Sequence, residues 1–231
     1  DQVKLATGEF YPYSGSKLTE GGMITALVKE SFSATEIKVD LYFLPWKRGF
    51  FYTLDHRMAA TFPYVKDVHR ETKFLFSDTI FSAKVRLFVR HDSKITFSKD
   101  NDLEGLSTCI PLGYSMKEIQ HFIDKRLVRI DMQPITDNNC LKAVHNGRVD
   151  FYSVNEITGQ ILIRDLFGES TVLKTVGEPI AINDYYLMIA KDYPEGDKLL
   201  QAFNSGLKKI KTNGKYQEII DQFANNPPQE K

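Results

Sequence analysis

Residues 65–78 read VKDVHRETKFLFSD and place one arginine, Arg70, between a polar turn and the apolar run Phe74-Leu75-Phe76. Elsewhere in the chain, four short runs rich in β-branched and aromatic residues predict strands. They are VKLAT (3–7), IKVDLYFL (37–44), RMAATF (57–62) and KVRLFVR (84–90). Between the first two runs, helical spacing is seen at Met23, Leu27, Val28 and Phe32. This alternation predicts an α/β fold.

Toward the C-terminus, the pattern predicts two consecutive helices. One helical face carries Leu199, Leu200, Phe203, Leu207 and Ile210. Asn213-Gly214 then supplies a stop signal. A second face carries Tyr216, Ile219, Ile220 and Phe223. The tail NNPPQEK (225–231) has two prolines and no periodicity, so we expect it to fray.

Two S-x-x-E patterns in the middle of the chain predict helix starts that follow strands. Ser115 precedes Glu118 in GLSTCIPLGYSMKEIQHFI, and Ser153 precedes Glu156 just after RVDFY. Such capping boxes mark helix N-termini, whose free N–H groups suit an anionic ligand group. The alternative is ordinary capping without a ligand.

Composition excludes several classes of partner. Thirty Lys and Arg residues balance thirty Asp and Glu residues, so no net field attracts a nucleic acid or an anionic membrane. The longest apolar runs are far shorter than the ~20 residues of a membrane span. The opening DQVKLATGEF has no charged segment followed by an apolar one, so we expect that any signal peptide has been removed or never existed.

Sequence motifs of catalysis and metal binding are missing. The chain has no G-x-S-x-G, H-E-x-x-H, Walker-type or G-x-G-x-x-G motif, and its five histidines have no regular partner spacing. Its two cysteines, Cys109 and Cys140, form no C-x-x-C and no zinc-like cluster. We therefore expect no metal, no cofactor and no catalytic residue.

Aromatic residues near turns suggest a binding site instead. They occur in Phe10-Tyr11-Pro12-Tyr13, Pro45-Trp46 and Pro63-Tyr64. Aromatic faces around one guanidinium, that of Arg70, would hold a small zwitterion or carboxylate, because a guanidinium binds a carboxylate through two hydrogen bonds. For each aromatic residue, core packing is the alternative.

Several segments together resemble the family 3 solute-binding proteins, the bilobal periplasmic receptors of polar amino-acid ABC importers. The similar segments occur in the family's order and span nearly the whole chain. They are GEFYPYS near the start, LPWKRG (44–49), FPYVKDVHRETKFLFSD, LEGLSTCIPLGYS, CLKAVHNGRVDFY and FNSGLKKIKTNGKYQEIIDQF.

This resemblance implies a type II periplasmic binding protein, in which two α/β lobes are joined by two hinge crossovers and enclose a ligand cleft. Lobe 1 would hold residues 1–88 plus 187–231, and lobe 2 would hold residues 89–186. The crossovers would lie in RLFVR (86–90) and YYLMIA (185–190).

The resemblance also implies the ligand-binding residues. Arg70, shortly before Phe76-Ser77, matches the arginine that grips the ligand's α-carboxylate. Phe10 matches the aromatic residue that covers the ligand, and Ser115 matches a hydroxyl residue that meets the carboxylate from lobe 2. Trp46 and Tyr64 are expected as neighbours in the cleft.

One position departs from the family's pattern. Amino-acid-binding members carry an aspartate five residues beyond the Asp of the G-R-[VI]-D element, and this chain has Asn155. Asparagine accepts a hydrogen bond from an ammonium group but supplies no counter-charge. We therefore expect a ligand that is not a standard α-amino acid, unless Glu9 or Glu156 supplies the missing charge.

The function implied is that of a monomeric binding protein, periplasmic or otherwise extracytoplasmic, that closes around a small polar ligand and delivers it to the membrane permease of an ABC importer. Two alternatives remain open. The same fold serves as the sensory ectodomain of membrane signalling proteins, and related bilobal proteins include a periplasmic dehydratase, whose acid here would have to be Glu9 or Glu156.

Cys109 and Cys140 are expected to form a disulfide. Cys109 lies on the strand before Pro111 and Cys140 near the start of the helix before the G-R-V-D element, so the two could meet across one strand-helix layer. The oxidising periplasm that the resemblance implies would favour the bond. The alternative is two buried free thiols.

Overall fold

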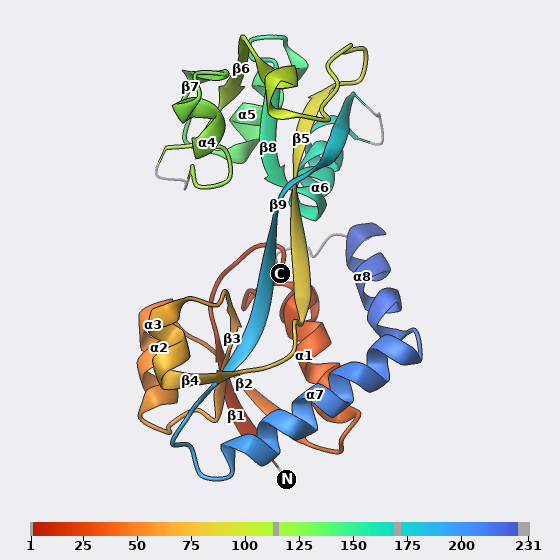
Figure 1. The fold of residues 1–231 in the computed structure, drawn as a ribbon. Helices are drawn as coiled ribbons and strands as arrows, with labels where there is room; N and C mark the ends of the chain where they lie inside the picture. Colours follow the sequence, from red (N-terminus) through yellow and green to blue (C-terminus); the bar gives the residue numbers. More distant parts are fainter. Residues whose placement is uncertain (1, 113–115, 169–171, 226–231) are drawn as a thin grey trace. The chain divides into compact units, whose positions relative to one another are not determined.

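A computed structural model describes residues 2–112, 116–168 and 172–225. The chain forms two compact units: unit 1 consists of Asp1–Ser82 and Asp184–Lys231, and unit 2 is Ala83–Asn183. The chain passes between the units twice, within the long strands β5 (Phe81–Arg90) and β9 (Leu173–Ala190) (Figure 1). The predicted lobe boundaries, after residues 88 and 186, fall within the same two strands.

Unit 1 contains a mixed sheet. Its strands are β1 (Gln2–Thr7), β2 (Lys38–Phe43), β3 (Ala60–Tyr64), β4 (Phe74–Phe76) and the second part of β9. β1 pairs in parallel with β2 on one side and with β3 on the other. β3 and β4 both run antiparallel to β9, where Thr61 and Phe76 pair with Met188. The predicted strands are therefore present, with β3 beginning three residues later than RMAATF.

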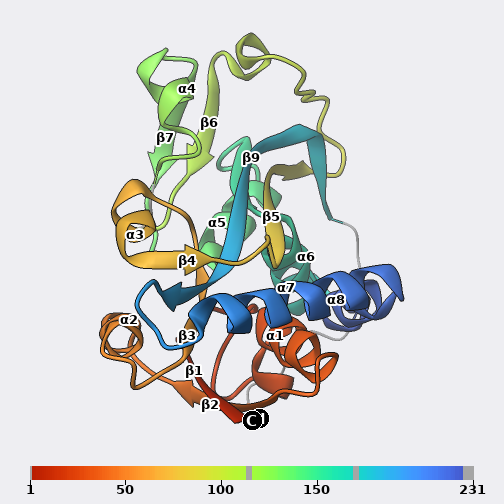
Figure 2. The same ribbon diagram turned by 60° about the horizontal axis from the view of Figure 1, so that its bottom comes forward.

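The helices of unit 1 are α1 (Met23–Ser33), α2 (Trp46–Leu54), α3 (Val68–Lys73), α7 (Gly196–Thr212) and α8 (Lys215–Asn225), with a 3-10 turn η1 at Thr19–Gly21. α1 packs against α7, and both the views in Figures 1 and 2 place the two side by side. The contact is close, because a Cβ added to Gly206 would lie 1.8 Å from the carbonyl oxygen of Ser31. Phe32 and Phe203 lie next to this contact, with ring centroids 5.0 Å apart.

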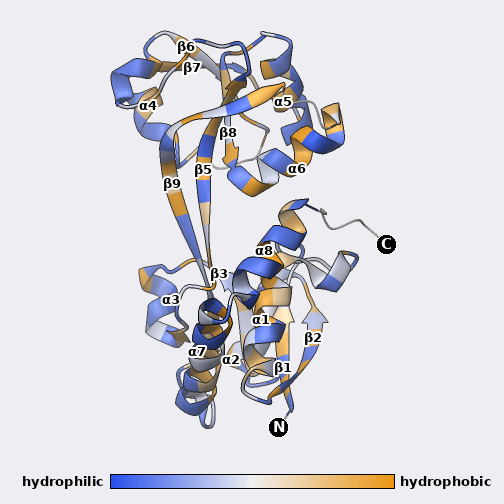
Figure 3. Ribbon diagram, turned by 90° about the vertical axis from the view of Figure 1, so that its right-hand side faces the viewer, coloured by the Kyte–Doolittle hydropathy of each residue, from blue (hydrophilic) through white to orange (hydrophobic). Residues whose placement is uncertain are grey.

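The predicted C-terminal helices are confirmed. α7 ends before Asn213, and Gly214 has a φ of 85°, a left-handed conformation that favours glycine and separates α7 from α8. Both helices carry hydrophobic and hydrophilic residues on different faces (Figure 3), with Phe203, Leu207, Ile210, Ile219 and Phe223 buried. Of the tail expected to fray, residues 225–231, Asn225 is the last residue of α8 and residues 226–231 lie outside the described residues.

Unit 2 contains a second sheet with the strand order β5-β8-β6-β7. The remaining elements of unit 2 are η2 (Asp100–Leu103), β6 (Leu106–Cys109), α4 (Gln120–Asp124), β7 (Val128–Met132), α5 (Asp137–His145), β8 (Phe151–Asn155) and α6 (Glu156–Phe167). β5 is antiparallel to β8, whereas β6 is parallel to both β8 and β7. Side chains alternate along β5: Leu87 and Val89 belong to one core cluster. Phe88 points the other way, toward Gly159 of α6.

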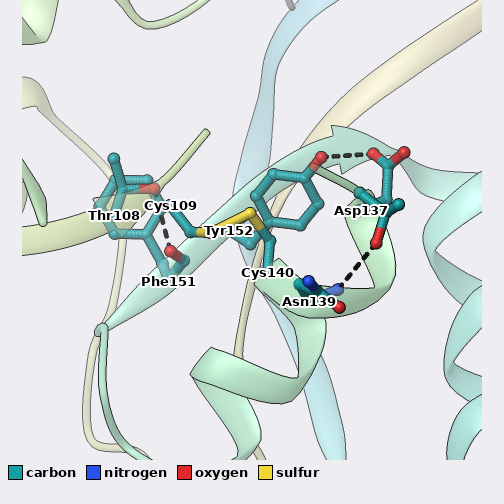
Figure 4. The surroundings of a disulfide bond; sticks show 8 residues. Thr108, Cys109, Asp137, Asn139, Cys140, Phe151 and Tyr152 are labelled. Atoms are coloured by element: carbon teal, nitrogen blue, oxygen red, sulfur yellow. Dashed lines mark hydrogen bonds between the residues drawn. A yellow bond between two sulfur atoms is a disulfide. The ribbon is translucent and has the colours of Figure 1, made fainter. Parts of the chain in front are cut away.

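The predicted disulfide is present in unit 2. It joins Cys109, at the end of β6, to Cys140 in α5, with their Cα atoms 5.4 Å apart (Figure 4). Both cysteines are fully buried in a core cluster that also contains Val144 and Tyr152. The Tyr152 hydroxyl donates a hydrogen bond to the carboxylate of Asp137 in the first turn of α5. The alternative of two free thiols is wrong.

The predicted capping box at Ser153 and Glu156 is wrong. Ser153 lies within β8 and pairs with Leu87, so strand pairing extends past the predicted helix start. α6 begins at Glu156, and its N-cap residue, Asn155, makes no side-chain capping bond. For the other box, Ser115 lies outside the described residues, and the described helix α4 begins only at Gln120. Within the described part of the chain, no helix is long and apolar enough to cross a membrane.

Candidate functional site

Three of the predicted ligand-binding residues come together in unit 1. The guanidinium of Arg70 lies over the Tyr64 ring, 5.2 Å from its centroid. The Trp46 indole meets the same ring edge-on at 5.6 Å, and the Tyr64 hydroxyl donates a hydrogen bond to the Trp46 carbonyl at 3.2 Å. We call this set the Arg70 cluster: Trp46, Tyr64 and Arg70.

Local structure fixes Arg70 at the start of a short helix. Asp67 is the N-cap residue of α3, and its Oδ1 accepts a hydrogen bond from the Arg70 backbone N–H at 2.8 Å. Its Oδ2 lies 2.9 Å from Arg70 Nη1, which also donates to the Val65 carbonyl at 2.9 Å. The bond from the Arg70 backbone, together with the charge of the guanidinium, lowers the pKa of Asp67. One end of the guanidinium is therefore held by the protein itself.

The other end of the guanidinium remains available for a ligand. The described residues give Arg70 Nε and Nη2 no hydrogen-bond acceptor, and 28% of the side chain is exposed. Tyr64 below it is largely buried, and this burial raises the pKa of its phenol, which therefore stays neutral. Trp46 is 36% exposed and offers an aromatic face beside the charge. This arrangement suits a carboxylate attached to a small organic group.

The backbone at Gly8 lies against the Trp46 ring and limits its position. A Cβ added to Gly8 would lie 2.5 Å from the indole, so only glycine leaves room for the ring there. The sequence signals for Trp46 and Tyr64 were prolines directly before them, and the structure places both residues at the ends of regular elements.

Phe10 makes different contacts in unit 1. Its ring lies 4.9 Å from Tyr13 and 5.5 Å from Tyr185, and Tyr13 is fully buried. No described ring or cation contact joins Phe10 to the Arg70 cluster. Its predicted role in covering the ligand stays a prediction.

Asn155 belongs to unit 2, at the end of β8. Its Oδ1 is buried and has no hydrogen-bond partner among the described residues. Glu156, next in the chain, lies with its carboxylate 4.0 Å from Nε of Arg86. Ser115, the remaining predicted ligand-binding residue, lies outside the described residues.

Two charged residues near these positions were missed by sequence reasoning. Asp67 carried an N-cap signal, being an aspartate just before a short helix, but nothing in the pattern indicated that it would also pair with Arg70. Arg86 interrupts the apolar strand KVRLFVR, and a charge in the middle of a strand that alternates toward a core is the signal that could have found it.

Glu9 and Glu156, the two residues that could supply the missing negative charge, each have a partner within the protein. Glu9 is exposed, and its Oε1 accepts a hydrogen bond from the Ser16 backbone at 3.0 Å. Glu156 lies next to Arg86, as described above. Among the described residues, no three His, Cys, Asp or Glu side chains are grouped closely enough to hold a metal ion.

Known proteins resemble this chain in sequence and in fold. An arginine-binding periplasmic protein from Mannheimia haemolytica is 26% identical over 159 residues, which cover 67% of this chain and 60% of that protein. The match therefore spans less than two thirds of that relative's length.

Among solved structures, the second substrate-binding domain of Lactococcus lactis GlnP, in its open conformation, superposes with a TM-score of 0.78 at 16% identity, covering 96% of this chain and 95% of that chain. A histidine kinase sensor domain with similarity to periplasmic binding proteins gives a TM-score of 0.64 at 19% identity, covering 99% and 98%. The predicted type II binding-protein fold is thus confirmed. The model of the bacterial extracellular solute-binding proteins, family 3, matches residues 6–226, and this chain belongs to that family.

Proposed function

We propose that this protein binds a small polar solute, an amino acid or a related carboxylate, outside the cytoplasm and delivers it to the permease of an ABC importer, acting as a monomer. The observation that carries the proposal is the Arg70 cluster in a member of the extracellular solute-binding family. The Mannheimia haemolytica relative is named for arginine binding and the periplasm, which supports both the solute class and the location.

The Arg70 cluster supplies the chemistry that such binding requires. Arg70 is held at Nη1 by Asp67 and by a backbone carbonyl, so little side-chain entropy remains to be lost when a solute carboxylate binds. Tyr64 and Trp46 add aromatic surface next to the charge. Family membership favours a binding protein over an enzyme.

A thermal-shift screen tests this function. The purified protein is heated with single amino acids, polyamines, small peptides and organic acids, and each hit is measured by isothermal titration calorimetry. A solute present at about 100 times its Kd adds roughly 2.7 kcal/mol to the free energy of unfolding. We expect at least one amino acid or carboxylate to stabilise the protein, and failure of every solute would contradict the proposal.

A sensory role is the second candidate, favoured by the similarity to the histidine kinase sensor domain. The two roles differ in what adjoins the solute-binding region. A transmembrane helix followed by a kinase or cyclase domain in the full-length gene product would favour sensing. Solute uptake that requires this protein together with a permease would favour transport.

A further inference from the structure

Lys66, in the loop between β3 and α3, lies over two aromatic rings of unit 1. Its Nζ is 4.4 Å from the centroid of the Tyr186 ring and 5.6 Å from that of the Phe76 ring. The two rings meet edge-on at 5.8 Å, and both are half-buried, whereas Lys66 is exposed. An ammonium group is attracted to the negative face of an aromatic ring. These contacts therefore position the Lys66 ammonium above a half-buried aromatic surface.

The ammonium of Lys66 still has all its hydrogen-bond donors available. Among the described residues, no acceptor and no carboxylate lies within hydrogen-bond or ion-pair distance of its Nζ. Lys211 of the same unit differs in this respect. Its Nζ lies 5.2 Å from the centroid of the Tyr216 ring, but it also donates a hydrogen bond to the Thr79 carbonyl at 2.8 Å. Lys66 can therefore take an anionic partner from outside the protein.

The pairing of β3 with β9 places Lys66 on the same face of the sheet as the Arg70 cluster. Tyr64 and Tyr186 lie directly opposite each other in this pairing. Their side chains therefore project from the same face, with Cβ atoms about 4.5–5.5 Å apart. Arg70 lies over the Tyr64 ring and Lys66 over the Tyr186 ring. Two cations thus lie over a pair of neighbouring tyrosines.

The acidic side chains next to this pair of tyrosines have other partners. Asp67 follows Lys66 in the chain, and both of its carboxylate oxygens contact Arg70. Asp184 precedes Tyr186 by two residues, and its carboxylate accepts a hydrogen bond from the Ser82 hydroxyl. Asp67 balances the charge of Arg70, and the charge of Lys66 remains. A solute with one carboxylate would leave that charge unpaired, whereas a solute with two would pair with both cations.

We propose that Lys66 binds a second carboxylate of the solute, whose first carboxylate binds Arg70, so that the preferred solutes are dicarboxylates. This inference rests on the proposed function and specifies its solute class. Arg70 holds the first carboxylate through Nε and Nη2, the donors that Asp67 and Val65 leave free. Lys66 carries its charge on a flexible four-carbon stem, so it can reach a second carboxylate at several spacings.

The test compares dicarboxylates with their monoamides, which have nearly the same shape and one negative charge fewer. Calorimetry measures the Kd of L-glutamate against L-glutamine and of L-aspartate against L-asparagine. A second arm, without an amino group, measures glutarate against glutaramate and succinate against succinamate. In at least one pair, we expect the dicarboxylate to bind ~5- to 30-fold more tightly, between the effects of an exposed ion pair and a charge-assisted hydrogen bond. The arm that shows the preference identifies the kind of dicarboxylate.

Variants at position 66 separate the second carboxylate from the first. Lys66→Gln should weaken binding of the dicarboxylate and leave binding of its monoamide nearly unchanged, because the monoamide needs only Arg70. Lys66→Met, which keeps an apolar stem, should do the same, whereas Lys66→Arg keeps the charge and most of the preference. Lys73→Gln removes an exposed charge at the end of α3 and is the control that should keep the preference. Circular dichroism melts verify that each variant is folded.

The inference is overturned if no dicarboxylate binds more tightly than its monoamide, or if the preference survives in folded Lys66→Gln and Lys66→Met. It is also overturned if Lys73→Gln removes the preference to the same extent. Binding only of solutes with one carboxylate would overturn this inference and leave the proposed function intact. Failure of every solute in the wider screen would overturn the proposed function itself.

Discussion

Unit 1 contains Arg70 and unit 2 contains Arg86, and the two guanidinium groups differ in how closely the protein pairs them. In unit 1, Arg70 has a carboxylate and a carbonyl oxygen at 2.9 Å each. In unit 2, Arg86 is more buried, yet its nearest carboxylate is 4.0 Å away and its hydrogen bond to Thr175 is 3.4 Å long. Unit 1 therefore presents a guanidinium that is already oriented, whereas unit 2 presents one that still has donors to satisfy.

The units also differ in what holds their chains together. Unit 1 consists of two segments far apart in sequence, and the contact of α1 with α7 at Gly206 brings them together without a covalent link. Unit 2 is one continuous segment and contains the only two cysteines of the chain, joined as a disulfide. We therefore expect unit 2 to lose stability when the disulfide is removed, and unit 1 when the packing of α1 against α7 is disturbed.

The largest effect is expected from removing the disulfide. Replacing Cys109 and Cys140 by alanine opens a loop closed across a sequence separation of 31 residues, which is expected to cost about 3–4 kcal/mol of stability in unit 2. Hydrogen exchange followed by mass spectrometry should show lost protection within residues 83–183 and little change in residues 2–82. Equal losses of protection in both units would contradict this difference between them.

A slightly smaller effect is expected from Gly206→Ala in unit 1. The added methyl group would lie 1.8 Å from the Ser31 carbonyl oxygen, so α1 and α7 must move apart. Overpacking of this kind costs about 1–3 kcal/mol, and a clash with backbone favours the upper end. Urea unfolding measures the loss. Ser205→Ala, at the exposed neighbouring position, is the control and should be nearly neutral.

Arg70→Ala tests the oriented guanidinium of unit 1. Losing a bidentate, partly exposed contact to a solute carboxylate is expected to cost about 2–3 kcal/mol, or roughly 30- to 150-fold in Kd. Calorimetry with the best solute of the screen gives the value. Lys73→Ala, an exposed cation at the end of α3, serves as the control. An unchanged affinity in folded Arg70→Ala would remove Arg70 from the site.

Unit 1 should also lose stability at high pH. The Tyr216 hydroxyl on α8 donates a hydrogen bond to the Ile80 carbonyl at 2.8 Å, and burial raises its pKa to about 12. Because this folded value lies above the unfolded value of 10.0, the contribution of Tyr216 is complete below pH 10 and is lost as pH rises to about 12. After discounting for partial exposure, the loss is about 2 kcal/mol.

Urea unfolding between pH 9 and 12 measures this loss of stability. Tyr216→Phe cannot ionise, so the difference in stability between Tyr216→Phe and the unmodified protein should shrink as pH rises. A difference that stays constant across this range would show that Tyr216 does not titrate in the folded state above its unfolded value.

Much of the fold could be predicted from the sequence, because its long elements repeat a clear pattern. The apolar residues of α7 and α8 keep helical spacing over several turns, and Gly214 marks the break between them. The disulfide was also predicted, because β6 and α5 each carry one cysteine at a place where neighbouring layers can meet.

The sequence failed where long-range pairing overrides a local signal. Ser153 has the spacing of a capping box, but its pairing with Leu87 keeps it in β8. Arg86 and Glu156 are far apart in sequence, and only the pairing of β5 with β8 brings them together. The Arg70 cluster was found, whereas the second carboxylate contact of Asp67 depends on side-chain geometry that local spacing does not contain.

Because unit 1 consists of two segments far apart in sequence, it cannot be completed until most of the chain has been synthesised. α1 lies near the start of the chain, and its partner α7 begins only at Gly196. At roughly 5–20 residues per second, a ribosome needs on the order of 10–40 s to reach the end of α7 after completing α1. Unit 2, a continuous segment, can fold in that interval. The part of α1 that packs against α7 stays uncovered until then, and the unfinished chain is exposed to chaperones and to aggregation.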